Sequence, residues 1–365
     1  MRTIDRYIAG SFLLTAFMAL FVFTFVLSIG IIFKITDLLA KGAAWQSVFQ
    51  IFIYSVPASL TYSIPIGTLI GSLLVFGRLS ADSEITALKA CGVNIWRIVL
   101  APIIISLIFA ALCLYINNEI GPRGHFGQRK SVAKLAMESP LQLLDEGRFI
   151  REFPELTVYI GEKRDNEIFD VRISDAREPG IVRDIRAKRG TIRVGDDGAD
   201  VVVDLFDVRI DPLLTDLPGD GFCDHWPIVI KDALKQRECP QTERDMTFAE
   251  LLEGIDNPKA HFPNLRDNNL TIQRMILLVE LHKRITLSLA CLAFVMLGIP
   301  LGIKSHRKES SIGIGISLLL VFNFYLFIIV GEAMAQHPAM QPHLIVWTPV
   351  VISIALGTLL LHRAQ

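Results

Sequence analysis

Charge is scarce in this sequence, and what there is lies unevenly along the chain. Charged residues make up 20% of the 365 residues, whereas apolar residues make up 52% and include 22 Phe. The formal net charge of -1 averages over segments in different surroundings, so it indicates no class of partner. A basic tail and a stripe of basic and aromatic residues are both missing, which argues against nucleic-acid binding.

Residue groups that carry catalytic chemistry are also missing. We find no metal-ligand spacing of Cys and His and no pairing of a nucleophile with a base, so we expect no metal, no cofactor and no enzyme. The nearest match to a phosphate-binding loop, GIPLGIKS at residues 298–305, has the wrong Gly–Gly–Lys spacing and contains Pro300. Any ATP-driven process must therefore use a separate ATPase subunit.

Long uncharged stretches take up much of the chain. They lie between Arg6 and Lys34, Lys41 and Arg78, Arg97 and Glu119, Arg284 and Lys304, Glu309 and Glu332, and Glu332 and Arg363. A helix needs roughly 20 apolar residues to cross a bilayer. The first stretch is far longer than the apolar core of a cleaved signal peptide, which has roughly 7 to 15 residues. We therefore predict six transmembrane helices.

Lysine and arginine predict the orientation. They precede the first span, separate the second from the third and the fourth from the fifth, and follow the sixth, while the loop AMAQHPAMQPH between the last two spans has neither. Because these residues mark cytoplasmic loops, we predict that both termini are cytoplasmic and that residues 119 to about 275 lie outside. Lys34 and Lys41, in the first outer loop, run against this rule.

The outer segment has the pattern of strands with one buried face. Short runs such as LTVYI, FDVRI, TIRV and VVVDLFDVRI alternate apolar and polar residues between Gly, Pro and Asp. This pattern predicts a β-sandwich or open barrel with helical flanks. The chain then divides into residues 1–118 with three spans, residues 119–275 as a β domain, and residues 276–365 with three more spans.

Two of the five cysteines, Cys223 and Cys239, lie in this outer segment. An oxidising compartment would permit a disulfide between them. The sequence does not show whether their geometry allows one, so a bridge and two separate thiols both stay open.

The stretch GRLSADSEITALKACGVN, residues 77–94, interrupts the apolar pattern between the second and third spans. It predicts a short helix at about residues 80–92. Ser80, Asp82 and Ser83 offer N-cap oxygens, Lys89 falls in the last turn, and Gly92 can close the helix. Such a helix is too short to be stable alone, so it must pack against something.

Two interpretations of this helix are open. It can be a plain connector at the membrane interface, or it can dock into a soluble cytoplasmic partner. In the second case Arg78 and Glu84 supply polar contacts, and Ile85 and Leu88 supply apolar ones.

Ionisable residues near the outer ends of spans allow a similar choice. Lys34, Asp37 and Lys41 follow one another at nearly one helical turn. They can simply reach the interface, or the two lysines can contact an anionic substrate. Glu332 lies near the outer end of the fifth span, and charges within membranes often mark function.

Three stretches resemble one family. RLSADSEITALKACGVNIWRI resembles the cytoplasmic segment of the YjgP/YjgQ (LptF/LptG) family, the permease subunits of the lipopolysaccharide export ABC transporter. ELHKRITLSLACLAFVMLGIPLG resembles the family's fourth span, and IDRYIAGSFLLTAF resembles its start. The layout of three spans, an outer β domain and three spans agrees. One departure is Val350, where the family tends to have Asn, so any role of that Asn is in doubt here.

The resemblance implies a fold, a location and a set of partners. The fold is an α-helical membrane protein with six transmembrane helices and an inserted periplasmic β domain of jelly-roll-like form, in the bacterial inner membrane. The partners are an LptB-like ATPase dimer, a second permease of the LptF or LptG type, an LptC-like periplasmic protein, and lipopolysaccharide. The sequence does not tell which of the two permeases the chain is.

The resemblance also implies roles for particular residues. The helix at about residues 80–92 becomes the coupling helix that inserts into the ATPase. Its contact region contains Arg78, Asp82, Glu84, Ile85, Leu88 and Gly92. The resemblance supports Lys34 and Lys41 as substrate contacts, whereas Glu332 is a candidate for a substrate or gate role because of its charge near the end of a span.

Two other classes of protein compete with this one. An ion-coupled secondary transporter is disfavoured because buried acidic residues are scarce and no inverted repeat is apparent. A membrane anchor that displays a β domain would leave the capped helix and the lysine pair without a role. Co-purification with an ATPase separates the permease from both.

Overall fold

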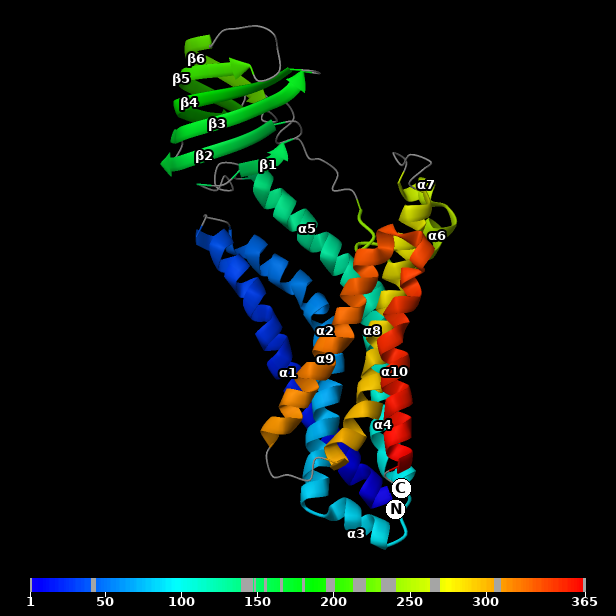
Figure 1. Cartoon of the computed structure of the whole chain (residues 1–365). Coiled ribbons are helices and arrows are strands. Elements are labelled where there is room, and N and C mark those ends of the chain that lie inside the picture. Colours follow the sequence, from blue (N-terminus) through cyan, green and yellow to red (C-terminus); the bar gives the residue numbers. More distant parts are fainter. Residues whose placement is uncertain are drawn as a thin grey trace. The chain divides into compact units, whose positions relative to one another are not determined.

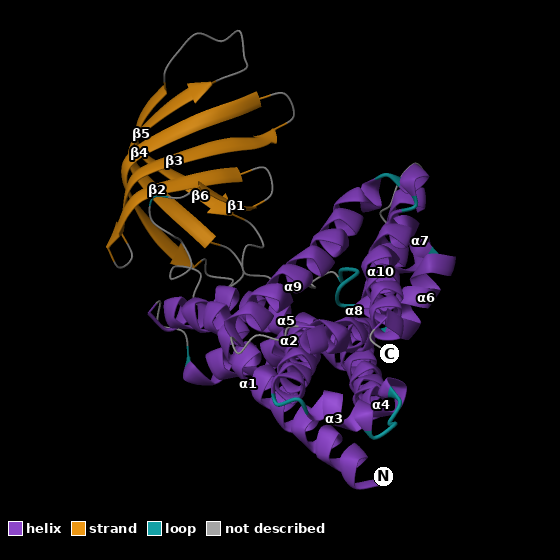
Figure 2. Ribbon diagram, turned by 60° about the horizontal axis from the view of Figure 1, so that its bottom comes forward, coloured by secondary structure: helices purple, strands orange, loops and turns teal. Residues whose placement is uncertain are grey.

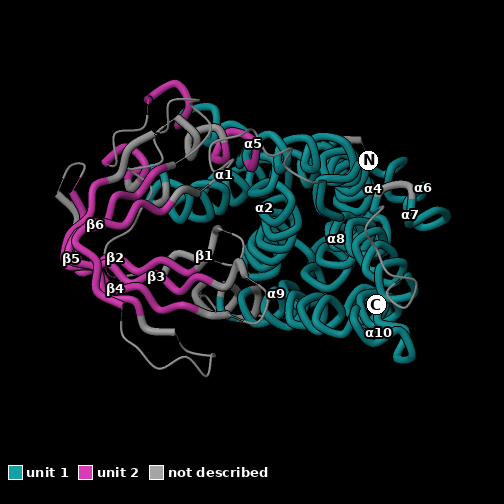
Figure 3. The backbone as a smooth tube through the Cα atoms, turned by 90° about the horizontal axis from the view of Figure 1, so that it is seen from above, with its two compact units in different colours: residues 1–35, 49–128, 240–365 teal, residues 36–48, 129–239 magenta. Residues whose placement is uncertain are grey.

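The chain forms two compact units in this computed structural model (Figure 3). One comprises residues 1–35, 49–128 and 240–365, and the other comprises residues 36–48 and 129–239. The structure describes residues 2–40, 44–138, 147, 149–153, 156–164, 167–178, 181–194, 201–212, 221–230, 241–262, 270–304 and 310–363. The first unit is helical, and the second contains the β-sheet.

Among the described residues, six helical segments are long and apolar enough to cross a bilayer, the number predicted from the uncharged runs. The helices are α1 (Arg2–Ala40), α2 (Trp45–Ala81), α4 (Ile95–Tyr115), α8 (Leu270–Lys304), α9 (Ser310–Ala333) and α10 (Pro342–Arg363). The third segment continues from α4 through a π-helix, η1 (Ile116–Ile120), into α5 (Gly121–Glu138). Both chain ends and the short helix α3 (Glu84–Ala90) lie at the same end of the helical unit (Figure 1), as an even number of crossings requires.

Helix α8 forms the centre of the helical unit. It contacts α4, α9 and α10, and residues such as Cys291, Phe294 and Ile299 are fully buried. Helices α1 and α9 instead leave large apolar side chains exposed, including Phe21 and Phe322. Such faces suit lipid or a second membrane protein. Because lipid tails are as apolar as the helices, close packing rather than the hydrophobic effect must hold the spans together.

Gly357 shows how close this packing is, and it gives a testable prediction. A Cβ at Gly357 of α10 would lie 2.4 Å from the carbonyl oxygen of Met296 on α8. Gly357→Val should therefore push the two helices apart and lower the free energy of unfolding by about 1–3 kcal/mol. Thermal unfolding in detergent measures the effect. Gly10→Val is the control, because a Cβ there meets nothing within 4 Å; equal loss in both variants would contradict this account.

The second unit contains one antiparallel sheet of six described strands in the order of the sequence (Figure 2). The strands are β1 (Phe149–Phe153), β2 (Leu156–Arg164), β3 (Glu167–Glu178), β4 (Ile181–Val194), β5 (Val201–Pro212) and β6 (Gly221–Ile230). Each of the four alternating runs in the sequence lies within a strand. Their apolar residues, including Ile160, Ile173 and Leu205, form one buried cluster. The strand order is a meander, so the jelly-roll-like form is not confirmed.

Only one of the two cysteines of the possible disulfide lies within the described residues. Cys223 lies on β6, and its thiol donates a hydrogen bond to the carbonyl oxygen of His225 at 3.0 Å. Cys239 lies outside the described residues, so the bridge stays a prediction.

The predicted helical flanks are present. Helix α5 precedes the sheet, and α6 (Phe248–Asp256) and α7 (Pro258–His261) follow it. Helix α6 begins after Thr247, whose backbone N–H donates to Oε2 of Glu250 at 2.7 Å, as in a capping box. Leu251 and Ile255 of α6 pack with Leu277 of α8. This contact places α6 in the helical unit.

Candidate functional site

The first candidate site is helix α3, and tertiary contacts fix where it begins. Helix α2 runs on to Ala81, so Ser80 still lies inside it and donates its hydroxyl to the carbonyl oxygen of Ile303 on α8 at 2.7 Å. Ser83 is the N-cap, but its φ of 60° is left-handed and its side chain makes no cap hydrogen bond. Ser83 therefore does not cap α3 through its side chain, and Ser80 does not cap it because α2 extends further than predicted.

The other end of α3 is closed by Gly92, as predicted. Gly92 has φ +80°, which favours glycine. Its N–H donates to the carbonyl oxygen of Lys89 at 2.9 Å, and the N–H of Val93 donates to that of Leu88 at 3.0 Å. These two bonds form a Schellman motif, which satisfies carbonyl groups that the helix end would leave open.

The side chains of α3 divide between the core and the surface. Ile85 is only 4% exposed and lies in the helical core with Leu79 and Ile95. This differs from the expectation that Ile85 contacts a partner: the core already uses its side chain. Arg78 is exposed and donates to the hydroxyl of Ser11 at 3.4 Å, and Asp82 is an exposed turn residue.

Glu84 and Leu88 face a groove between α1 and α3. The groove has a volume of about 290 Å³. It is lined by Ile4, Tyr7, Ile8, Leu79, Glu84, Ala87, Leu88 and Cys91. The hydroxyl of Tyr7 donates to Oε1 of Glu84 at 3.4 Å. Among the described residues the lining is thus largely apolar and includes one carboxylate, Glu84.

Of the three predicted substrate residues, the structure describes the side chain of Glu332 alone. Lys34 lies on α1, but its side chain is outside the described part of the chain, as is the whole of Lys41. Glu332, at the end of α9, accepts a hydrogen bond from Nζ of Lys283 at 2.6 Å, and Nη2 of Arg244 lies 4.0 Å from its other oxygen. Glu332 is therefore half of an ion pair.

Lys283 and Glu332 belong to a group of charged residues that was not predicted from the sequence. We call it the ionic cluster, and it consists of Glu280, Lys283, Arg284 and Glu332. Lys283 also pairs with Glu280, and Nε of Arg284 donates to Oε1 of Glu280 at 3.0 Å. The three α8 residues are between 4% and 8% exposed. Buried charges need such partners. The sequence could have indicated this cluster, because Lys283 and Arg284 follow Glu280 by three and four residues and so share a helix face with it.

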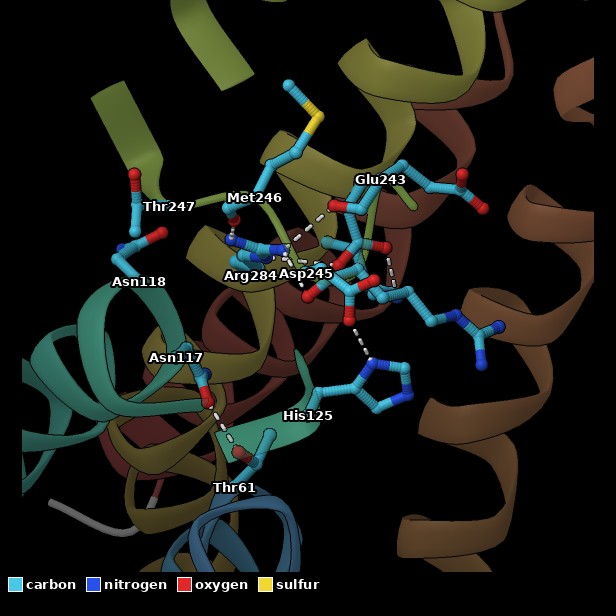
Figure 4. A network of polar contacts seen from close by, with 12 residues as sticks. Thr61, Asn117, Asn118, His125, Glu243, Asp245, Met246, Thr247 and Arg284 are labelled. Carbon is cyan, nitrogen blue, oxygen red and sulfur yellow. Dashed lines mark hydrogen bonds and ion pairs between the residues drawn. The ribbon is translucent and has the colours of Figure 1, made fainter. Parts of the chain in front are cut away.

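The ionic cluster extends to residues 241–247, which we call the return segment (Figure 4). Arg284 donates to the carbonyl oxygens of Met246 at 2.6 Å, Glu243 at 3.2 Å and Arg244 at 3.3 Å. Backbone carbonyls thus satisfy the part of the guanidinium that Glu280 leaves open.

Asp245 ties the return segment to α5. Its side chain is fully buried, and its Oδ1 lies 2.6 Å from Nδ1 of His125 on α5. Its Oδ2 accepts from the backbone N–H of Thr242 at 2.9 Å. The return segment therefore fastens α5 to α8 where the chain leaves and re-enters the helical unit.

A third polar group joins three spans deeper in the unit. Thr61 of α2 donates to Oδ1 of Asn117 at 2.6 Å, and Nδ2 of Asn117 donates to the hydroxyl of Ser288 on α8 at 3.1 Å. Asn117 lies in the π-helix η1, a local form often found at functional sites. Hydrogen bonds of this kind help spans to associate in lipid.

Six spanning segments, a short closed helix between two of them and an inserted antiparallel sheet define a multi-pass membrane protein with an inserted β domain. Comparison with known families is more specific. The chain belongs to the family described as "Lipopolysaccharide export system permease LptF/LptG", whose pattern matches residues 6–363. The resemblance found in the sequence motifs is confirmed.

Individual relatives agree with the family. The chain is 24% identical over 311 residues to "Lipopolysaccharide export system permease protein LptF" of Escherichia coli (strain K12), a match that covers 84% of this chain and 79% of that protein. The protein of the same name from Shigella flexneri gives the same values. An uncharacterized protein of Rickettsia prowazekii is 24% identical over 164 residues, 45% of this chain and 46% of that protein.

Proposed function

We propose that the chain is one permease subunit of an ATP-driven transporter that extracts lipopolysaccharide from the inner membrane and passes it to a periplasmic protein. Membership of the permease family over residues 6–363 is the observation that carries this proposal. Since the sequence has no phosphate-binding loop, a separate LptB-like ATPase dimer supplies the energy. A second permease completes the path, and an LptC-like protein receives the lipid.

Helix α3 is the contact with the ATPase in this proposal. Glu84 supplies a carboxylate and Leu88 an apolar side chain at the groove, while Arg78 and Asp82 are exposed beside it. Ile85 anchors the helix from inside, and Gly92 fixes its end. Because the bond from Ser80 to Ile303 ties the end of α2 to α8, displacement of α3 reaches both spans.

Lipopolysaccharide enters at the opposite end of α1. Lys34 and Lys41 neutralise phosphates of its lipid A portion there. Glu332 supports the path indirectly, by holding Lys283 in place. The β domain is periplasmic, and its apolar face shields acyl chains from water. Both termini and α3 are then cytoplasmic.

Purification from membranes in mild detergent tests this function. We expect an ATPase, a second permease and lipopolysaccharide to accompany the chain. A chain that transports lipid without any associated ATPase would be an ion-coupled carrier, and one that transports nothing would be an anchor; either result contradicts the proposal.

Lys34→Asp should impair lipopolysaccharide capture while leaving the complex assembled. Hydrogen bonds to charged groups contribute about 1.5–3 kcal/mol, so capture should fall roughly tenfold or more. Photocrosslinking of lipopolysaccharide to the purified complex measures it. Lys34→Arg keeps the charge and serves as the control. Unaltered crosslinking in Lys34→Asp would remove Lys34 from the substrate site.

A further inference from the structure

The sheet bends along a row of residues that crosses its strands. Asp170 of β3, Lys188 of β4, Asp207 of β5 and Asp224 of β6 occupy this row, which we call the crease. Strand pairing is regular on both sides of it, as Phe169 with Arg189 and Val171 with Ala187. Within it, Asp170 and Asp207 have positive φ angles of 48° and 55°.

At the crease, β3 and β5 each place one extra residue on the polar face. Ile168 and Val171 are both buried in the apolar cluster, so the two residues between them both lie on the polar side. Leu205 and Val208 of β5 repeat this arrangement. Since neighbouring strands have the irregularity at the same level, the sheet bends while its apolar face stays continuous.

A cavity of about 480 Å³ opens at the crease. Its charged lining comprises Asp170, Arg186, Lys188, Asp207, Arg209 and Asp224. Phe222 of β6 completes it, with a side chain that is 77% exposed and a ring centroid 5.8 Å from Cζ of Arg209. This volume is in the range of small-ligand sites, which hold about 300–1,000 Å³.

Two features of the cavity destabilise the folded sheet. Arg186 and Arg209 stand directly opposite each other on β4 and β5, and like charges in that position destabilise a sheet. The left-handed Asp170 and Asp207 store backbone strain, which tends to gather at functional sites. Asp184 offsets part of the charge, with its Oδ2 3.1 Å from Nη2 of Arg186.

The mixture of acidic and basic side chains in the cavity indicates which class of ligand can bind there. A bare anion would meet three carboxylates, and a bare cation would meet three basic side chains. A phosphorylated sugar meets both demands, because its phosphates pair with guanidinium groups and its hydroxyls donate to carboxylates. The exposed ring of Phe222 offers an apolar face for the C–H side of a sugar.

We propose that this cavity binds the phosphorylated glycan of lipopolysaccharide on the polar face of the sheet. The proposal rests on the function proposed above, and it adds a contact for the head of the lipid to the apolar face that shields its tails.

Titration of the purified full chain with completely deacylated, phosphorylated lipopolysaccharide glycan tests the site. We expect Arg186→Ala combined with Arg209→Ala to lower the affinity at least tenfold, and Phe222→Ala to lower it severalfold. Arg189→Ala is the matched control: Arg189 lies on the same strand and the same face but does not line the cavity, and it should change the affinity less than twofold. Removing the phosphates from the glycan should weaken binding to the unaltered chain.

Failure of the proposed glycan site and failure of the proposed transport function give different experimental results. Cavity variants that bind the glycan like the unaltered chain would overturn the site, even if intact lipopolysaccharide and an ATPase still co-purify. Variants that keep the glycan but lose a periplasmic protein would show a protein interface instead, which also overturns it. Failure of the unaltered chain to co-purify with lipopolysaccharide or an ATPase would contradict the transport function, while the soluble glycan would still report on the cavity.

Discussion

Glu84→Arg is expected to abolish association with the ATPase and, with it, ATP-driven export. Glu84 is the one carboxylate among the described residues that line the groove between α1 and α3, where apolar side chains surround it. A partner that covers the groove removes this charge from water and must supply a cation. Reversing one charge of such a pair costs about 2–5 kcal/mol or more, which weakens binding by roughly 30-fold to several thousandfold. Co-purification of the ATPase and export in reconstituted vesicles measure the two effects.

Two controls distinguish this from damage to the chain itself. Tyr7→Phe removes only the internal hydrogen bond to Glu84, so the ATPase should stay bound. Glu84→Gln keeps the shape and loses the charge, so it should fall between the unaltered chain and Glu84→Arg. Normal export by the Glu84→Arg variant would contradict the assignment of α3 as the coupling helix.

Glu280→Ala is expected to have the largest effect on stability. Glu280 pairs with both Lys283 and Arg284, and all three side chains are buried within α8. Removing one member of a buried ion pair costs about 3–5 kcal/mol, because the remaining charge is left without compensation. In this variant Lys283 keeps Glu332, but the partners that the described residues still offer Arg284 are backbone carbonyls. Thermal unfolding of the chain in detergent should show a large fall in the midpoint.

Glu332→Gln provides the comparison for the ionic cluster. Its side chain is partly exposed, and Lys283 would keep Glu280 as a partner, so a loss below about 1 kcal/mol is expected. Similar unfolding midpoints for Glu280→Ala and Glu332→Gln would show that α8 does not depend on Glu280.

The ionic cluster also has contacts outside α8. Arg284 binds the return segment, and Asp245 of that segment binds His125 of α5. These contacts connect α8 to the return segment and, through it, to α5. The ionic cluster therefore fixes α8 to its neighbours on two sides, at Glu332 of α9 and at the return segment.

Much of the architecture could be predicted from the sequence alone. Uncharged runs gave the number of spans, since crossing a bilayer requires a fixed length of apolar helix. Alternating runs predicted the strands, and Gly92 predicted the end of α3. Strands and helix ends can be predicted in this way because both depend on local backbone geometry. The family motifs also belong to this level, since they are contiguous stretches of chain.

The tertiary structure alone decided which side chains meet. Ile85 was expected at a partner surface, but the core formed by distant helices buries it. The sequence showed Glu332 as a single charge near a span end, and the structure pairs it with Lys283, which lies 49 residues earlier on another helix; its contact with substrate stays a prediction. The crease arises from matching irregularities on separate strands. Periodicity fixes which face of an element a residue occupies, whereas the neighbour of that face depends on how distant elements pack, and no local pattern contains that information.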